Sequence, residues 1–367
     1  DTGTTLTAPT FTGEATASGN LTVSGDLIPS TPLSHRNMVI NGAMNVAQRG
    51  TSSTSAGYRT VDRMGGDFGY VAITQSQETL TTGSPYDNGF RKSIKHLTTN
   101  NVTTAATYFS TEYRIEAQDI VGSGWNYTSA SSYITLSFWV KISPAGTYHT
   151  MVRTEDGTKY WYAKQYTVSA DTWTKVEMSV PGNSNLTINN DNGKGLSIYP
   201  FIAYGTNYSV SGGTEESWTA YSGSLQTFES SGVPTWLNTT SAYVEFTGVQ
   251  LELGSNATPF EHRTFQDDYL ACQRYYYVIA SHRQYIAGRT SNTNAMYCAP
   301  SCPVRMRSTP SIGNLGNFNI DCIHSEGGAT SLNSTPTIDT YPTDGMGVGN
   351  TVGNIGLSGG SGLTDGR

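Results

Sequence analysis

Three cysteines and a histidine near the end of the chain are the residues whose types best suit a metal ion. Cys298 and Cys302 are separated by three residues, and Cys322 and His324 follow downstream. Four such ligands at tetrahedral distance would hold zinc. However, neither the C-x3-C spacing nor the C-x-H half is usual for a zinc site, and free cysteines are commonly buried. We therefore predict no metal and no other cofactor.

Paired carboxylates are the next residues that could do chemistry. Glu215 and Glu216 are adjacent in a Gly-rich stretch, so in a strand they would point apart, and Asp267 and Asp268 look like a helix start. The sequence has no nucleophile elbow, metalloprotease motif or phosphate loop, and its six histidines are scattered. We predict no enzymatic activity. A hydrolase site assembled from two distant carboxylates is the alternative.

Aromatic residues form three clusters that could bind sugar, because flat rings cover the apolar faces of pyranose rings. Two clusters lie in predicted loops and one in a predicted strand, and together they comprise Trp125 and Tyr127, Tyr160, Trp161 and Tyr162, and Trp218 and Tyr221. In a strand, Trp161 must face opposite to its two neighbours. The alternative for these residues is packing in the core or at a trimer interface.

The composition favours a neutral partner. Only 13% of the residues are Asp, Glu, Lys or Arg, and the net charge is −7. Binding to the phosphates of nucleic acid needs a basic surface, so nucleic acid is a poor candidate. No apolar run is long enough to insert into a membrane. Neutral polar side chains suit a glycan.

A short glycine-spaced repeat opens the chain. Residues 11–28 read FTGEAT, ASGNLT and VSGDLI. Each unit can bury only one or two side chains, so the repeat must stack against other copies. We predict a trimeric β stalk over residues 1–33, in which the contacts come from Gly13, Gly19, Leu21, Val23, Gly25 and Leu27. A flexible linker is the alternative interpretation.

The remainder of the chain has the pattern of antiparallel β structure. Short apolar or alternating runs separated by Gly, Asn, Ser and Pro predict a β-sandwich over residues 34–265. The best strands are 108–117, 133–142, 149–154, 160–168, 174–180, 196–203 and 242–253. For residues 266–367 we predict a smaller β-rich region. It begins with a short helix capped by Asp267 or Asp268, and its last fifteen residues resemble a linker.

Three charged residues alternate with apolar ones in the first of these strands. Glu112, Arg114 and Glu116 share one face, opposite Tyr113 and Ile115. That face either lines a polar groove or is an ordinary solvated surface. We favour the solvated surface, because cross-strand ion pairs are common on protein exteriors.

Two long motifs resemble a known family. NMVINGAMNVAQRGTS near the start and GVQLELGSNATPFEHRTFQDDYLACQRYYY near the end resemble the boundary motifs of a module in bacteriophage tail-fibre and tail-collar proteins. YRIEAQDI, LSFWVKIS and TWTKVEMSVPG resemble its interior strands. The resemblance covers residues 37–277. It implies a jelly-roll domain like a carbohydrate-binding module, with the first and last strands side by side.

Many modules of this family hold a structural calcium ion, but this sequence departs from their pattern. The two acidic positions of the family correspond to Asn45 and Gly248. Calcium prefers six to eight oxygen ligands. The resemblance therefore does not extend the calcium site to this chain.

The resemblance implies a structural and adhesive role. We expect a tail-fibre subunit of a virion, assembled in the host cytoplasm, that binds host-surface polysaccharide non-covalently as a homotrimer and contacts other tail proteins through its N-terminus. A glycan depolymerase tailspike and a secreted lectin-like domain are the alternatives.

Overall fold

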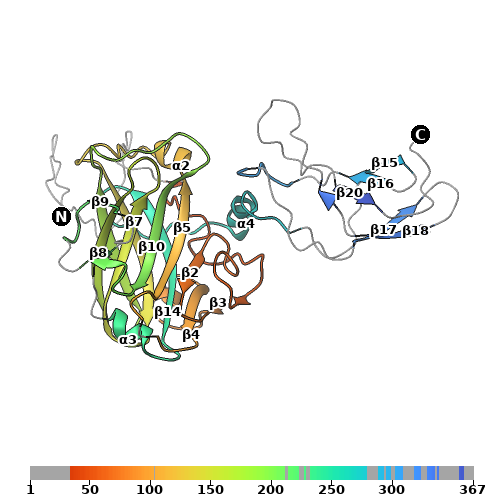
Figure 1. Ribbon diagram of the computed structural model, residues 1–367. Helices are drawn as coiled ribbons and strands as arrows, with labels where there is room; N and C mark the ends of the chain where they lie inside the picture. The colour runs from red at the N-terminus through yellow and green to blue at the C-terminus, as the bar shows by residue number, and fades with distance from the viewer. Residues whose placement is uncertain are drawn as a thin grey trace, which may run out of the picture.

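A computed structural model of the protein describes residues 34–102, 104–210, 214–222, 227–228, 232–278, 288–292, 295–298, 302–308, 318–323, 329–334, 337–338 and 355–358. The predicted stalk, including Gly13, Gly19, Leu21, Val23, Gly25 and Leu27, lies outside these residues. Figure 1 shows a sandwich of two sheets, helix α4 beside it, and short strands on the other side of α4. The predicted all-β class is confirmed.

The first sheet has six antiparallel strands in the order β1-β3-β4-β14-β6-β9. Their bounds are β1 Ser52–Ser53, β3 Ile73–Thr79, β4 Lys92–Thr98, β14 Tyr243–Leu253, β6 Tyr133–Ile142 and β9 Thr174–Pro181.

The second sheet also has six antiparallel strands, in the order β12-β8-β7-β10-β5-β2. Their bounds are β12 Thr219–Ala220, β8 Tyr160–Val168, β7 Gly146–Thr154, β10 Lys194–Tyr204, β5 Tyr108–Glu116 and β2 Gly65–Gly69. A small parallel pair is formed by β11 (Ser209–Val210) and β13 (Thr227–Phe228). Short helices lie in the connections: α1 (Ser84–Asp87), α2 (Ala117–Val121) and α3 (Val233–Leu237).

The main hydrophobic core lies between the two sheets. Ile134, Leu136, Phe138 and Val140, which alternate along β6, are all buried there, as the sequence pattern predicts. Trp236 of α3 extends this core and stacks on a phenylalanine of β5. Burying this much apolar surface supplies most of the stability of a sandwich of this kind.

The start and the end of the sandwich lie side by side, as the family resemblance implies. The amide of Met38 donates to the carbonyl oxygen of Leu251 at 2.9 Å, and the amide of Val249 donates to that of Gly42 at 3.0 Å. A Cβ atom at Gly42 would lie only 2.1 Å from the Val249 oxygen, so this contact needs glycine.

A bulge in β14 occupies the region where the family's calcium pattern would fall. Gly248 has a φ of 66°, and the register shifts between Thr247 and Gln250. A Cβ atom there would meet the Phe90 ring at 2.6 Å. Asn45 meanwhile offers its carbonyl oxygen to the side chain of Gln77 at 3.2 Å. Glycine at position 248 thus accommodates an aromatic ring, where an acidic side chain would not fit.

Helix α4 (Phe265–Gln273) confirms the predicted helix, but its cap differs from the prediction. The N-cap is Thr264, whose side chain accepts from the amide of Asp267 at 3.2 Å, and Asp267 accepts in turn from the Thr264 hydroxyl at 2.7 Å. Asp268 is buried and accepts from the amide of Asn41 at 3.2 Å. The acidic pair therefore supports the first turn and ties the helix to the sandwich.

Beyond α4 the described strands are β15 (Gly288–Asn292), β16 (Ala295–Cys298), β17 (Phe318–Ile323), β18 (Ala329–Ser334), β19 (Thr337–Ile338) and β20 (Ile355–Ser358). β20 pairs with both β16 and β19, so residues 355–358 of the predicted linker form a strand. Among the described residues, no helix has the length and apolar character needed to cross a membrane.

Candidate functional site

The structure separates the seven predicted aromatic residues between two environments. Trp161 is only 2% exposed and lies in a cluster on the outer face of the second sheet, together with Tyr221. Its neighbours Tyr160 and Tyr162 point the other way and pack against the inter-sheet core, as the alternation requires.

The two loop clusters also pack against the inter-sheet core. Trp125 is buried, donates to the carbonyl oxygen of Ser132 at 3.2 Å and contacts Tyr127 edge-on at 6.3 Å. Trp218 is half-buried, donates to the carbonyl oxygen of Pro181 at 2.7 Å, and its ring lies 5.4 Å from that of Tyr162. Glycan contact by these residues stays a prediction.

The register of the second sheet places polar and aromatic side chains from five strands in a row across its outer face. Arg114 of β5 is opposite Ser197 of β10, which is opposite Arg153 of β7. Arg153 is in turn opposite Trp161 of β8, which pairs with Thr219 of β12. Residues that are far apart in the sequence thus form one line perpendicular to the strands.

Carboxylates fix both guanidinium groups of this row. Glu112, which is 7% exposed, pairs with Arg114 at 2.5 Å, and Glu155 accepts from Arg153 at 2.8 and 3.0 Å. The hydroxyl of Ser197 lies between them, 2.8 Å from Glu155 and 3.2 Å from Glu112. The preferred interpretation of Glu112, Arg114 and Glu116 as a solvated face is therefore wrong for Glu112 and Glu116, which are buried and belong to hydrogen-bonded networks. The Arg114 side chain is 40% exposed.

Charge lowers the pKa of Glu155 despite its position. Burial alone would raise it, but Arg153 and the hydrogen bonds from Lys159 and Ser197 outweigh burial and lower the pKa of Glu155 to about 2. Glu155 is thus ionised at every physiological pH, and the row keeps its arrangement.

A half-buried tyrosine lies near each arginine. The guanidinium carbon of Arg114 is 5.7 Å from the centre of the Tyr58 ring, and that of Arg153 is 5.7 Å from the centre of the Tyr221 ring. We call Tyr58, Arg114, Ser197, Arg153 and Tyr221 the arginine–tyrosine row.

Two polar atoms at one end of this row lack partners. The hydroxyl oxygen of Tyr58 and Nε of Arg114 are buried, yet neither has a hydrogen bond within the described part of the chain. Burial also raises the pKa of Tyr58 to about 12, so its hydroxyl keeps its proton and can donate. Buried donors without acceptors are rare in proteins, and they are satisfied when a ligand supplies oxygen atoms.

A pair of carboxylates adjoins the row. Asp67 of β2 is opposite Ser110 of β5, and Glu112 follows two residues along the same face. Burial and the charge of Glu112 raise the pKa of Asp67, while Glu112 is held by Arg114. The two carboxyl groups therefore differ in environment.

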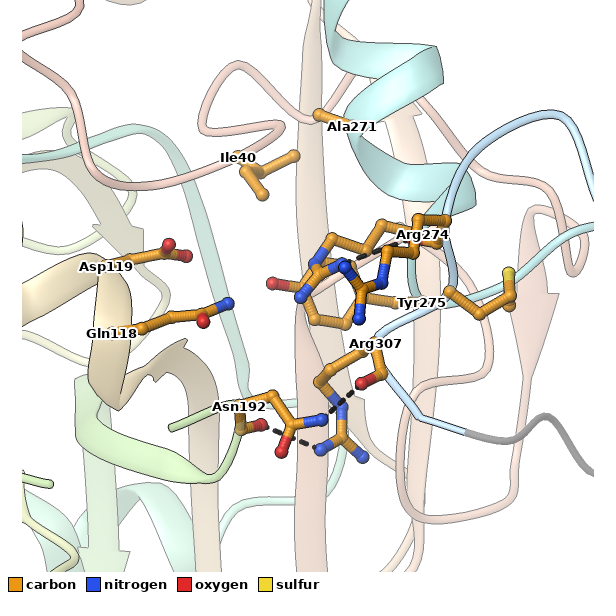
Figure 2. Close-up of a pocket in the computed structure, with 10 residues that line it drawn as sticks. Ile40, Gln118, Asp119, Asn192, Ala271, Arg274, Tyr275 and Arg307 are labelled. Carbon is orange, nitrogen blue, oxygen red and sulfur yellow. Dashed lines mark hydrogen bonds between the residues drawn. The ribbon is translucent and has the colours of Figure 1, made fainter. Parts of the chain in front are cut away.

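A pocket of about 430 Å³ lies where the sandwich meets the C-terminal end of α4 and residues 302–308. Figure 2 shows Gln118 and Asp119 on one side of it and Arg274 and Tyr275 on the other, with Asn192 and Arg307 hydrogen-bonded to each other. The remaining lining side chains are Ile40, Ala271, Arg305 and Met306.

One wall of the pocket is fixed to the sandwich by Glu116. Arg274 donates to the two oxygens of Glu116 at 2.8 and 2.7 Å, and the Tyr275 hydroxyl donates to the same carboxylate at 2.5 Å. Such a bidentate pair sets both position and orientation. It holds the end of α4 against the end of β5.

The cysteines give no sign of a metal site in the part of the chain that the structure covers. Cys272 and Cys302 are buried free thiols, and the described residues contain no group of three or more His, Cys, Asp and Glu side chains arranged around an ion. The side chains of Cys298 and Cys322, and the whole of His324, lie outside the described residues.

Sequence reasoning did not select most of the arginine–tyrosine row. Tyr58, Ser197 and Arg153 lie in three separate segments with no shared motif. Tyr221 was selected within an aromatic cluster, and the alternation around Arg114 gave a second signal, through the polar-groove alternative for that strand. The register between β5, β10 and β7, which brings them together, is a tertiary property.

Comparison with known proteins assigns no family. No family model matches the sequence, and no curated protein matches it. Similar solved structures include tailspike protein 4 of bacteriophage CBA120, in its enzymatically active domain. The identity is 11% and the TM-score 0.31, and the match covers 59% of this chain and 21% of that chain.

Two further solved structures match over their own full length. The C-terminal family 22 carbohydrate binding module of Clostridium thermocellum Xyn10B is 11% identical, with a TM-score of 0.31, and the match covers 62% of this chain and 100% of that one. A cyclase from Fischerella sp. TAU is 8% identical, with a TM-score of 0.34, and the match covers 63% of this chain and 100% of the cyclase chain. These similarities leave the function of this chain open.

Proposed function

We propose that this chain is a structural and adhesive subunit of a phage tail fibre that binds host-surface glycans non-covalently. The family resemblance of residues 37–277 supports the virion role, and the arginine–tyrosine row supports the binding role. In this proposal the subunit is assembled in the host cytoplasm and joins other tail proteins through its N-terminus.

The observation that carries the binding role is the pair of unpartnered donors at one end of the row. The Tyr58 hydroxyl and Nε of Arg114 are buried and have no acceptor among the described residues, so a glycan that binds them must do so with a local shift that uncovers them. Sugar hydroxyls are acceptors of the right kind, and the Tyr58 and Tyr221 rings can cover the apolar faces of sugars. Because Glu112 and Glu155 balance both arginines, the row suits uncharged hydroxyl groups.

A trimer carries three copies of each site, so weak binding at a single site would suffice for adhesion. A single site of this type binds sugar at about millimolar concentration, whereas linked sites raise the apparent affinity by roughly 10² to 10⁴. We therefore propose a homotrimer formed through residues 1–33. Deleting these residues is expected to lower whole-cell binding about a hundredfold while the single-site affinity stays the same, and light scattering reports the loss of the threefold mass.

The variant Tyr58→Phe tests the row with little disturbance to the fold. It removes one buried hydroxyl that has no partner, so the free energy of unfolding should stay equal or rise slightly. Affinity for an uncharged host oligosaccharide, measured by titration calorimetry, should fall about fivefold. Tyr70→Phe is the matched control, because Tyr70 is 71% exposed and lies outside the row. Equal affinity in Tyr58→Phe and the parent would refute the assignment.

Glycan cleavage is the second candidate, and Asp67 with Glu112 is the observation that favours it. A carboxyl group with a raised pKa, Asp67, beside a second carboxylate paired with an arginine, Glu112, is an arrangement that glycoside hydrolysis by two carboxyl groups could use. Incubation with host polysaccharide and an assay for new reducing ends distinguishes the two candidates. Sustained release that Asp67→Asn abolishes would replace the adhesin proposal by a depolymerase.

A further inference from the structure

The pocket between the sandwich and residues 302–308 differs from the row in its charge. Asn192 and Arg307 join its two sides through two hydrogen bonds. The Arg307 guanidinium donates to the carbonyl oxygen of Asn192 at 3.0 Å. In return, the Asn192 side chain donates to the carbonyl oxygen of Arg307. The amide of Arg307 also donates to the carbonyl oxygen of Arg274 at 2.9 Å. These bonds orient Arg307 through neutral groups.

Arg307 has no ion-pair carboxylate among the described residues. Arg274 is neutralised by Glu116, but none of the ion pairs found within the described residues involves Arg307. Among the described lining residues the one acidic side chain is Asp119, which is exposed. In Figure 2 it lies with Gln118 on the side of the pocket opposite Arg274 and Tyr275. A half-buried guanidinium in a pocket with no carboxylate partner favours an oxyanion, which it can bind with two parallel hydrogen bonds.

The rest of the lining suits the body of a sugar. Gln118 and Asn192 offer amides that can bond hydroxyl groups, and Ile40, Ala271 and Met306 offer apolar contact. A volume of about 430 Å³ lies within the range of pockets that enclose small ligands.

We propose that this pocket binds an acidic sugar residue, with its carboxylate or phosphate on Arg307. This inference rests on the proposed glycan-binding function and narrows it to an anionic surface polysaccharide. Carboxylate and phosphate groups are both oxyanions that a guanidinium can bind. Uronic acids of capsules would supply the carboxylate, and phosphorylated sugars of lipopolysaccharide would supply the phosphate.

Titration calorimetry of the full chain with glucuronic acid, glucose 6-phosphate and glucose tests the proposal. We expect both acidic sugars to bind more tightly than glucose, and the preferred one identifies the source. Equal affinity for glucose and both acids, or no heat from any of the three, would overturn the proposal.

Two variants with opposite expected signs assign the binding to this pocket. Arg307→Gln should weaken binding of the preferred acid about fivefold, and Asp119→Asn should strengthen it, because a repelling charge is removed. Arg91→Gln is the matched control, since Arg91 is an exposed arginine that also donates to carbonyl oxygens. A failure of Arg307→Gln to weaken binding would contradict the site. Because Tyr58→Phe tests the row with neutral glycan, the two proposals can fail separately.

Discussion

The two polar regions of this protein use arginine in contrasting ways. In the arginine–tyrosine row, Arg114 and Arg153 each lie within 3 Å of a buried carboxylate, and Ser197 links the two pairs. In the pocket, the partners of Arg307 within the described residues are the Asn192 side-chain amide and main-chain oxygens. Compensated arginines present directed donors without net charge, whereas an uncompensated one attracts anions. Predictions about stability and pH distinguish the two arrangements.

The largest expected effect comes from removing the carboxylate that organises the row. Glu155→Gln deprives Arg153, Lys159 and Ser197 of a common acceptor whose side chain is 1% exposed. We expect the free energy of unfolding to fall by about 3 kcal/mol, because a buried charge is left without its partner. Chemical denaturation followed by tryptophan fluorescence measures it.

The pocket supplies the contrasting control. Arg307→Gln removes a half-buried guanidinium that pairs with a neutral oxygen, and the expected loss is below about 1 kcal/mol. If Arg307→Gln destabilised the chain as much as Glu155→Gln, the distinction between compensated and uncompensated arginines would be wrong.

Acid should destabilise the fold in two overlapping pH ranges. Burial lowers the pKa of His96 in the core to about 3. Below about pH 6.5, His96 therefore binds a proton in the unfolded chain but not in the native state. The free energy of unfolding falls as the pH decreases. His149, with a pKa lowered by burial to about 4, acts in the same range.

Glu155 acts in a more acidic range. Its depressed pKa contributes stability above about pH 4.5, and that contribution is lost as the pH falls toward 2. Denaturation curves between pH 7 and 2 should show that His96→Met reduces the slope of stability against pH above about pH 4.5, where Glu155 contributes little. Glu155→Gln should reduce the slope below about pH 3, where His96 contributes little, and exchange of these two outcomes would contradict the assignments.

The strands from β5 to β10 and β14 were predictable from the sequence because each has its own apolar pattern, whereas β2, β3 and β4 were not among the predicted ranges. β6 and β14 follow the predicted ranges closely, since residues such as Phe138 and Val140 repeat at the period that one buried face demands. The cap of α4 was misassigned because Thr264 precedes an acidic pair that also suits a helix start.

Neither polar region could be assembled from the sequence in the same way. The row joins β5, β7 and β10, and the pocket joins residues near 118, 192, 274 and 307. No local period connects these positions, because sheet register and the docking of α4 determine which of them meet.

A smaller effect is expected at the cap that positions one wall of the pocket. Thr264→Ala removes the hydroxyl that caps α4, at a cost of about 1 kcal/mol in helix stability. Acidic-sugar affinity should fall slightly, while neutral-glycan affinity at the row stays constant. Thr128→Ala, at an exposed threonine bonded only to Asn126, is the control. Equal losses at both sites would show that the two regions are not independent.

A crystal structure of the protein with a host oligosaccharide tests the central claim most directly. The account predicts sugar oxygens within hydrogen-bond distance of the Tyr58 hydroxyl and of Nε of Arg114, with a ring against Tyr221. Sugar bound at another surface, with those two donors still unpartnered, would contradict it.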